Sequence, residues 1–288
     1  MSRLLAELVH LLRLEPIEQG LFRGQSQDLG FPQVFGGQVI GQALSAAQQT
    51  VSAERTVHSL HSYFLLPGDA SRPIIYDVEV LRDGGSYATR RVKAVQGGKA
   101  IFYMTASFHL QEDGFNHQAP MPEVTAPELL RSEHEIAQQF ADKLPARIRD
   151  NYLGQMPIEM RSATPFNSLD PKPMAAERNV WMRADGPLPD DPLVHRYLLA
   201  YASDFNFLPT ATQPHGVSFM QPQIQMATLD HAIWFHRPLR MDDWLLYHVV
   251  SPSAGAGRAL VHGQFFNRDG LLVASTSQEG VFRRRQPR

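Results

Sequence analysis

Helix-like and strand-like patterns follow one another in the same order twice along this chain. In each half, a segment with apolar residues at helical spacing precedes four runs rich in β-branched and aromatic residues. The first half has its predicted helix at about 36–50 and its strands near 56–66, 73–82, 86–96 and 100–109. The second half has its helix at about 191–207 and its strands near 222–237, 243–252, 257–267 and 271–284. The pattern predicts a duplicated unit.

A shift of 171 positions brings the two halves into register. It places Pro67 on Pro238 and Phe64 on Phe235. Few residues are identical, so the shared order of elements supports the repeat more strongly than identity does. One helix against an antiparallel sheet of four or five strands is an α+β unit. Two such units would each have a sheet edge to hide, and we expect them to pair edge to edge.

Proline-rich sequence separates the two halves. The passage QEDGFNHQAPMPEVTAPELL is interpreted as a linker, and a helix is expected to follow it near 128–142. At the N-terminus, leucines at helical spacing predict another helix, and Pro16 marks its expected end. We therefore predict an N-terminal unit at 1–115, a linker with a connecting helix at 116–149, and a C-terminal unit at 150–288.

Composition excludes several classes of protein. The 288 residues are 43% hydrophobic and 19% charged, which is typical of a globular protein with a sizeable core. The net charge of -2 argues against a nucleic-acid binder, and we interpret the basic run Arg283–Arg285 with Arg288 as a solvated tail. The absence of cysteine excludes disulfides, Cys-ligated metals and a cysteine nucleophile, and it fits a cytoplasmic protein. No run of about 18 apolar residues occurs, so no membrane span is expected.

Longer motifs give the chain a family resemblance. They occur in one order over nearly its whole length: LFRGQSQDLGFPQVFGGQVIGQAL, VHSLHSYFLLPGD, PIIYDVEVLRDGGSYATRRV, IFYMTASFH, YASDFNFLP, ATLDHAIWFHRP, WLLYHV and LVASTSQEG. Together these motifs resemble the type II acyl-CoA thioesterases. The resemblance implies a double hotdog fold, in which each unit wraps an antiparallel sheet around a helix. It also implies hydrolysis of fatty acyl-CoA to free acid and CoA, an Asp–Thr–Gln set that orients a water, and assembly into a homo-oligomer (dimer or tetramer).

Familiar patterns for other chemistry are missing from the sequence. It contains no G-x-S-x-G elbow, no H-E-x-x-H and no phosphate-binding loop. The pairs His58/His61 and His231/His236 have no spacing that indicates a metal, so we expect neither metal nor cofactor and interpret these histidines as satisfied or exposed. Without a covalent nucleophile, a thioester would be hydrolysed by direct attack of water, which requires a base and donors for the oxyanion.

Asp204 is the main candidate for that base. It lies in YLLAYASDFNFLP, near the expected end of a helix, where a negative charge opposes the helix dipole by about a few tenths to 1 kcal/mol. A residue that works against its local environment indicates another purpose. A turn or capping residue ahead of Pro209 gives the same pattern, and the family resemblance favours the catalytic interpretation.

Thr228 and Gln278 complete the set that the resemblance implies. A hydroxyl and an amide can both hold a water without competing for its proton, although each is also an ordinary residue of a strand. At the shift of 171, Thr228 falls on Val57 and Gln278 on Ser107, and the first helix contains no acid. We therefore expect the first half to lack this site and to supply a wall instead.

The first half also supplies weaker candidates. Gly36 and Gly37 open its helix, and their backbone N–H groups are candidates for binding the thioester oxygen, although glycines here also ease the turn into the helix. His58 is a secondary candidate for substrate contact or proton transfer.

Two alternative functions compete with hydrolysis. SDFNFLP partly matches the G-D-x-N-P-x-H loop of hotdog hydratases, with Asp204 and Asn206 in place. Phe207 and Leu208 stand where that loop continues toward its histidine, so the acid–base partner is missing. The other alternative is an acyl-CoA binding module without activity, which would not need the three polar site residues.

Overall fold

The computed structural model describes residues 1–30, 33–143, 153–154 and 156–285. The helices are α1 (Arg3–Leu11), α2 (Gly36–Gln48), α3 (Glu133–Gln139) and α5 (Pro192–Ala202), with 3-10 helices η1 (Pro127–Leu129), η2 (Ala141–Lys143) and η3 (Leu208–His215). The strands are β1 (Glu15–Glu18), β2 (Leu21–Gly24), β3 (Thr56–Phe64), β4 (Ile74–Asp83), β5 (Tyr87–Gln96), β6 (Lys99–His109), β7 (Ile158–Ser162), β8 (Glu177–Ala184), β9 (Ile224–Thr228), β10 (Asp230–Phe235), β11 (Leu245–Gly255), β12 (Arg258–Asn267) and β13 (Leu272–Arg284).

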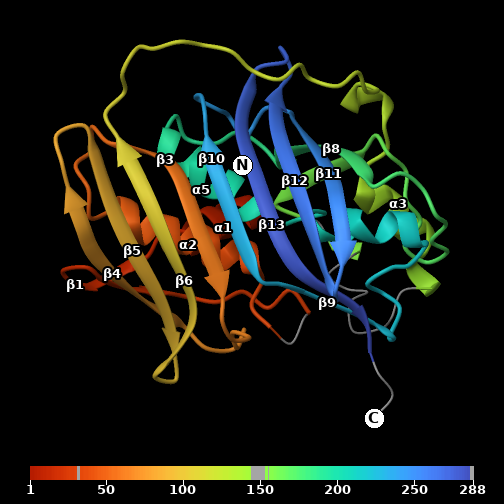
Figure 1. Ribbon diagram of the computed structural model, residues 1–288, viewed down its shortest axis with the longest axis horizontal. Helices are drawn as coiled ribbons and strands as arrows, with labels where there is room; N and C mark the ends of the chain where they lie inside the picture. The colour runs from red at the N-terminus through yellow and green to blue at the C-terminus, as the bar shows by residue number, and fades with distance from the viewer. Residues whose placement is uncertain (31–32, 144–152, 155, 286–288) are drawn as a thin grey trace.

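These strands form one sheet in which all the pairs are antiparallel, and its order reads as two matching halves (Figure 1). The order is β1-β2-β4-β5-β6-β3 followed by β10-β13-β12-β11-β8-β7, and β9 adds to β13. The halves join where β3 pairs with β10, and His61 lies opposite Ala232, its own counterpart at the shift of 171. The predicted edge-to-edge junction and the double hotdog fold are confirmed.

The register of the strands refines the repeat. A shift of 171 positions carries Tyr87–Gln96, which is β5, onto Arg258–Asn267, which is β12. The next strand follows a different shift, because Ala106 pairs with Arg90 whereas Gln278 pairs with Val261, the counterpart of Arg90. The structural counterpart of Gln278 is therefore Ala106.

The assignment of Gln278 to Ser107 was wrong by one residue, and one residue decides which face of a strand a side chain occupies. The turn between β12 and β13 spans Arg268–Leu271, two residues more than the Gly97–Gly98 turn between β5 and β6. Both hairpins shift their pairing at equivalent positions, between Ala94 and Val95 and between Phe265 and Phe266, so the change of register arises in the turn itself. Asn267 bonds to Leu271 across three residues, whereas Gln96 pairs with Lys99 across two. As a result Gln278 faces the core, while the Ser107 hydroxyl contacts His58.

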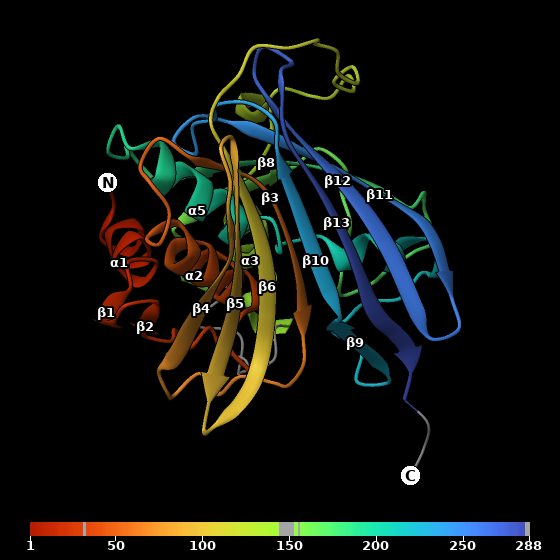
Figure 2. The same ribbon diagram turned by 60° about the vertical axis from the view of Figure 1, so that its left-hand side comes forward.

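The two central helices lie side by side on the inner face of the sheet (Figure 2). Their backbones approach closely because α2 presents Gly37 and Gly41 to α5. A Cβ on Gly37 would lie 2.1 Å from the Tyr201 carbonyl oxygen, and one on Gly41 would lie 3.1 Å from that of Tyr197. Only glycine is compatible with the first of these distances.

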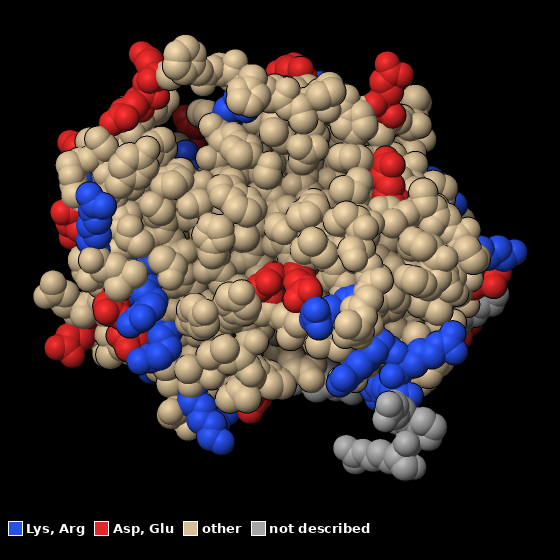
Figure 3. All heavy atoms as spheres, in the orientation of Figure 1, with Lys and Arg blue, Asp and Glu red and all other residues tan. Residues whose placement is uncertain are grey.

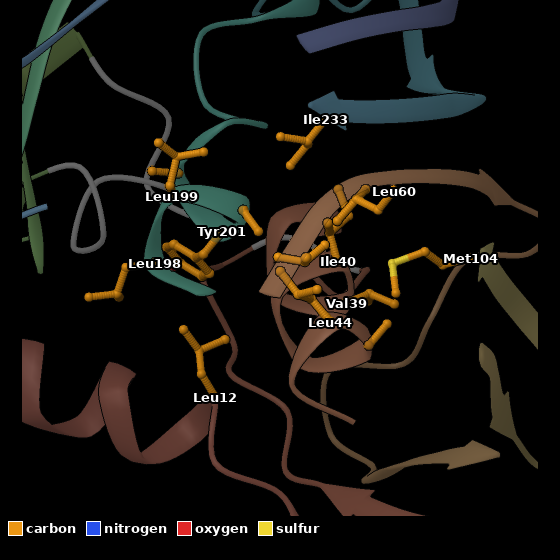
Figure 4. Close-up of a cluster of buried hydrophobic side chains, with 14 of the residues drawn as sticks. Leu12, Val39, Ile40, Leu44, Leu60, Met104, Leu198, Leu199, Tyr201 and Ile233 are labelled. Atoms are coloured by element: carbon orange, nitrogen blue, oxygen red, sulfur yellow. The ribbon is translucent and has the colours of Figure 1, made fainter. Parts of the chain in front are cut away.

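The hydrophobic core fills the space between these helices and the sheet (Figure 4). Ile40 and Leu44 of α2 lie near Leu60 of β3, and Leu198 of α5 lies near Leu12, which follows α1. All five side chains are at most 2% exposed. The core therefore joins both halves of the chain into one packed interior.

Some elements differ from the predicted ones. Helix α1 ends at Leu11, and Pro16 lies in β1; neither β1, β2, β7 nor β8 was predicted. The strand expected near 222–237 is two strands separated at Leu229. The helix expected near 128–142 is three short pieces, and α3 buries no side chain. The predicted boundary at 149/150 and residue Arg288 lie outside the described residues, and none of the described helices is long and apolar enough to cross a membrane.

The outer face of the sheet carries few charged side chains (Figure 3). Aromatic side chains from its central strands lie there in contact: Tyr63 stacks on Tyr103, and His61 packs against Trp234. Tyr63 is 49% exposed, Tyr103 37% and Trp234 36%. We refer to these four residues as the outer aromatic patch.

Candidate active site

Asp204 lies where the C-terminal end of α5 meets the N-terminal end of α2. It follows Ser203, the C-cap residue of α5. Helix α2 begins after Phe35 without a side-chain cap, and the Gly37 backbone N–H donates to the Asp204 carboxylate. A Cβ on Gly36 would lie 2.6 Å from Asp204 Oδ2, so a side chain at position 36 would displace the carboxylate. The acid of the second half thus caps the helix of the first half.

The surroundings of Asp204 raise the pKa of its carboxyl group above the value that it has in water. Loss of hydration raises the pKa of Asp204 to about 6, although hydrogen bonds from Gly37 and Gln278 favour the charged form. Phe35 stacks on Phe205 with ring centroids 4.4 Å apart, and both pack edge-on against Tyr201, which gives the site an apolar side. Taken as a whole residue, Asp204 is partly buried.

Gln278 joins the other two predicted residues. Its side chain on β13 is 1% exposed, and its amide Nε2 donates to Thr228 Oγ1 at 3.0 Å. The same amide donates to the Asp204 carboxylate. Thr228 is the last residue of β9 and lies opposite Gly280 of β13. The structure therefore brings Asp204, Thr228 and Gln278 into one hydrogen-bonded cluster.

His231 belongs to the same network and was missed by the sequence analysis. It is fully buried; its Nδ1 lies 2.6 Å from Gln278 Oε1 and its Nε2 lies 2.9 Å from Ser203 Oγ. Burial lowers the pKa of His231 to about 4. One signal was available: at the shift of 171 this histidine falls on Leu60, and a polar residue in place of a core leucine indicates a local purpose.

Two further residues extend the network behind the cluster. The Tyr247 hydroxyl donates to the Ser203 carbonyl oxygen at 2.9 Å and lies 2.9 Å from Thr276 Oγ1. This contact satisfies one of the carbonyl groups that the end of α5 leaves without a helical partner. The last turn before Asp204 is thus fixed to β11.

Of the remaining candidates, Gly36 and Gly37 lie at the cluster and His58 lies apart from it. Gly36 and Gly37 lie beside Asp204, but the N–H of Gly37 is bound to the carboxylate. His58 lies at 2.8 Å from Ser107 Oγ and packs edge-on against Tyr87 and His109. No contact among the described residues links His58 to Asp204, Thr228 or Gln278.

The first half has apolar residues at the positions equivalent to Thr228, His231 and Gln278. Thr228 lies opposite Gly280 as Val57 lies opposite Phe108. The counterparts of His231, Gln278 and Thr228 are therefore Leu60, Ala106 and Val57, and these three are at most 2% exposed. Only the second half carries the polar set.

Two surface hollows of the described residues lie apart from the cluster, and the described residues form no metal site there. The described residues contain no group of three or more His, Asp or Glu side chains placed to hold a metal ion. One hollow lies between α1, α2 and α5 near Leu12 and Tyr197, and another lies on the outer face near Trp234 and His262. The linings of these two hollows do not include Asp204, Thr228 or Gln278.

Comparison with known proteins gives matches over both halves. A family model described as acyl-CoA thioesterase matches residues 149–281, and one described as acyl-CoA thioesterase N-terminal domain matches residues 25–109. Acyl-CoA thioesterase 2 of Haemophilus influenzae is 46% identical over 98% of this chain and 99% of its own length. Human acyl-coenzyme A thioesterase 8 is 41% identical over 95% of this chain and 88% of its own.

Solved structures match along the whole chain as well. The acyl-CoA thioesterase II TesB2 from Mycobacterium marinum has a TM-score of 0.80 and 42% identity, covering 97% of this chain and 99% of its own. A protein with a hot dog fold from Alicyclobacillus acidocaldarius has a TM-score of 0.78 at 20% identity, covering 98% of this chain and 99% of its own, and this supports the fold alone.

Proposed function

This chain belongs to the type II acyl-CoA thioesterase family and is an acyl-CoA thioester hydrolase, and we propose that it hydrolyses fatty acyl-CoA by direct attack of a water held by Asp204, Thr228 and Gln278. The observation that carries this proposal is the hydrogen-bonded cluster of these three side chains at the meeting point of α2 and α5. A carboxyl group with a pKa of about 6 is well suited to act as a base near neutral pH.

In the proposed reaction, the oxygen of the water bonds to the thioester carbonyl carbon while Asp204 accepts one proton from that water. Thr228 and Gln278 hold the water in position. The carbon–sulfur bond of the tetrahedral intermediate then breaks, and the CoA sulfur takes the proton from Asp204. The products are a free carboxylic acid and CoA, and Asp204 returns to its charged form.

The surroundings of Asp204 suit an acyl thioester. The aromatic group of Phe35, Tyr201 and Phe205 offers an apolar surface next to the carboxylate, as a fatty acyl chain requires. Because the Gly37 N–H is bound to Asp204, we assign contact with the thioester oxygen first to the N–H of Gly36 at the start of α2. His58 stays a secondary candidate, to be tested only if Asp204 proves dispensable.

Hydration of an enoyl thioester is less well supported than hydrolysis. It needs a histidine free to exchange a proton beside the acid. His231 has both ring nitrogens in hydrogen bonds, to Gln278 and Ser203, and burial keeps it neutral. His215, the nearest histidine after the SDFNFLP motif, packs against Phe282 instead.

Incubating the purified protein with palmitoyl-CoA and a thiol reagent tests the function. Release of CoA at a rate that depends on the protein supports hydrolysis, and it should persist in EDTA because no metal is expected. An absorbance change from an enoyl group without thiol release would indicate hydration instead. Tight binding without turnover would contradict both reactions.

We also propose that the protein is a cytoplasmic homo-oligomer. The outer aromatic patch supports this assembly, because contiguous exposed aromatic side chains with few charges are typical of a protein interface. Light scattering of the wild-type protein should give a mass that is twice or four times 32.4 kDa. Trp234→Lys should lower that mass, and a monomeric wild-type protein would contradict the proposal.

A further inference from the structure

We propose that His231 is a positioning residue for the hydrolysis, which fixes the Gln278 side-chain amide in the one orientation that serves Asp204. This inference rests on the proposed function. It concerns a residue that touches neither the water nor the substrate and acts through Gln278.

The contacts of His231 determine which of its nitrogens carries a hydrogen. The carbonyl oxygen of Gln278 can only accept, so His231 Nδ1, 2.6 Å away, must donate. Because burial keeps the ring neutral, Nε2 has no hydrogen and accepts from the Ser203 hydroxyl at 2.9 Å. The same hydroxyl lies 2.9 Å from the Ala200 carbonyl oxygen and cannot donate its single hydrogen fully to both.

The orientation of the Gln278 side-chain amide has to be set by a hydrogen-bond partner. The two ends of a side-chain amide have nearly the same shape, so packing alone does not select between its two orientations. With its oxygen on His231, the amide nitrogen directs both hydrogens toward Thr228 Oγ1 and the Asp204 carboxylate. In the reversed orientation the amide oxygen would face the Asp204 carboxylate and repel it. His231 therefore decides whether Gln278 stabilises Asp204 or opposes it.

His231 also connects the strand that carries Gln278 to the helix end that carries Asp204. Ser203 immediately precedes Asp204, and its hydroxyl is the second partner of His231. The ring thus spans the gap between α5 and β13 with one hydrogen bond to each side. Such a bridge limits the distance between the proposed base and the amide.

The two halves of the chain provide an independent indication. Three positions that are polar in the second half, the buried His231 and Gln278 and the partly buried Thr228, are all apolar in the first half. If the histidine served only packing, the first half could keep a histidine at position 60 even though it lacks the threonine and the glutamine. Buried polar groups are costly unless each is paired, so the three are expected to appear or disappear together.

Two near-isosteric variants separate positioning from packing. His231→Asn places its amide nitrogen where His231 has Nδ1 and can still donate to Gln278, whereas His231→Gln places its polar atoms near Nε2. We expect His231→Asn to keep kcat within about 3-fold and His231→Gln to lower it by about 10–10²-fold, with KM changed by less than about 3-fold in both. His236→Gln is the matched control, since His236 follows the same strand, contacts Ser275 Oγ and should keep full activity.

A double variant and the wild-type ring give further tests. In a His231→Gln background, Gln278→Ala should cause little additional loss, because its amide is already misplaced. In the wild type, ¹⁵N NMR should find His231 neutral with its hydrogen on Nδ1 between pH 5 and 8, and this measurement does not depend on whether any variant folds. A hydrogen on Nε2, or equal kcat values for the Asn and Gln variants, would overturn the inference. If the wild-type protein released no CoA, or Asp204→Asn kept full activity, the proposed function itself would fail instead.

Discussion

Asp204 lies between two helix ends of opposite sign. The C-terminus of α5 disfavours its charge, while the N-terminus of α2 favours it through the Gly37 N–H. The sequence revealed only the first of these effects, because the second comes from a helix more than 150 residues earlier. The net effect of the whole environment, including lost hydration, is a proton held more tightly than in water.

Asp204→Asn should abolish most of the activity while preserving the fold. The amide keeps the size of the carboxyl group but cannot accept a proton from water, and such bases typically contribute about 10²–10⁴-fold. We expect kcat for palmitoyl-CoA to fall by that factor, with Tm unchanged or higher by about a few degrees. Turnover within a few-fold of wild type, or loss of the folded state, would return Asp204 to a purely structural role.

The pH dependence should follow the ionisation of Asp204. Because the base must be charged, kcat/KM should fall as pH drops below about 6 and should level off above it. Stability has the opposite sign: the pKa of the folded state is raised above the ordinary value of 3.8, so the contribution of Asp204 to stability is full below about pH 4 and is lost as pH rises to about 6. The Tm advantage of Asp204→Asn over wild type should therefore be larger at pH 7 than at pH 4. An advantage that is equal at both values would contradict the assigned pKa.

Thr228→Val and Gln278→Ala should each cost less than the loss of the base. In the proposed mechanism each holds the water rather than taking its proton, so we expect kcat to fall by about 10–10³-fold for either one. The losses should not add when combined with Asp204→Asn, because the three side chains act on a single water. Steady-state kinetics of the single and combined variants check this, and additive losses would mean that the residues act independently.

At the scale of elements, the start of α2 is the part of the first half most sensitive to change. A Cβ at Gly36 would lie 2.6 Å from Asp204 Oδ2 and 3.0 Å from Phe64 Cζ, so one of these groups must move. Gly36→Ala should lower kcat by about 10-fold or more, since about 1 Å of misplacement can cost about 10²-fold. Gly85→Ala is the matched control, because nothing lies within 4 Å of its added Cβ. Equal activity of the two variants would exclude a role for position 36.

Long alternating or continuous patterns predicted their elements well, and short ones did not. Eight long strand patterns correspond to β3–β6 and β9–β13, whereas β1 has four residues, all exposed, and leaves no pattern to read. The family resemblance supplied Asp204, Thr228 and Gln278. It could not supply His231, whose partners lie 28 and 47 positions away. The correct counterpart of Gln278 required the sheet register, because an altered hairpin is not visible in a pattern of period two.

At the scale of the whole molecule, the proposed site depends on both halves. Asp204 and Gln278 belong to the second half, while Gly36, Gly37 and Phe35 belong to the first. Fragments 1–115 and 116–288 should each be inactive, since each would expose an edge strand, β3 or β10, and one face of a central helix. Co-expression of the two fragments should restore CoA release, because the junction forms between intact strands. Full activity of 116–288 alone would contradict the shared site.

The apolar image of the cluster in the first half determines how many substrate molecules a chain can process at once. If the two halves of the chain were identical, they would form two equivalent sites, one at each end of the paired helices α2 and α5. Here Val57, Leu60 and Ala106 leave one end without its polar groups. We therefore expect a binding stoichiometry of one acyl-CoA per chain, so that an oligomer would hold as many sites as chains. In the proposed mechanism these three positions of the first half take no part in catalysis, and we expect them to tolerate any apolar side chain that packs equally well.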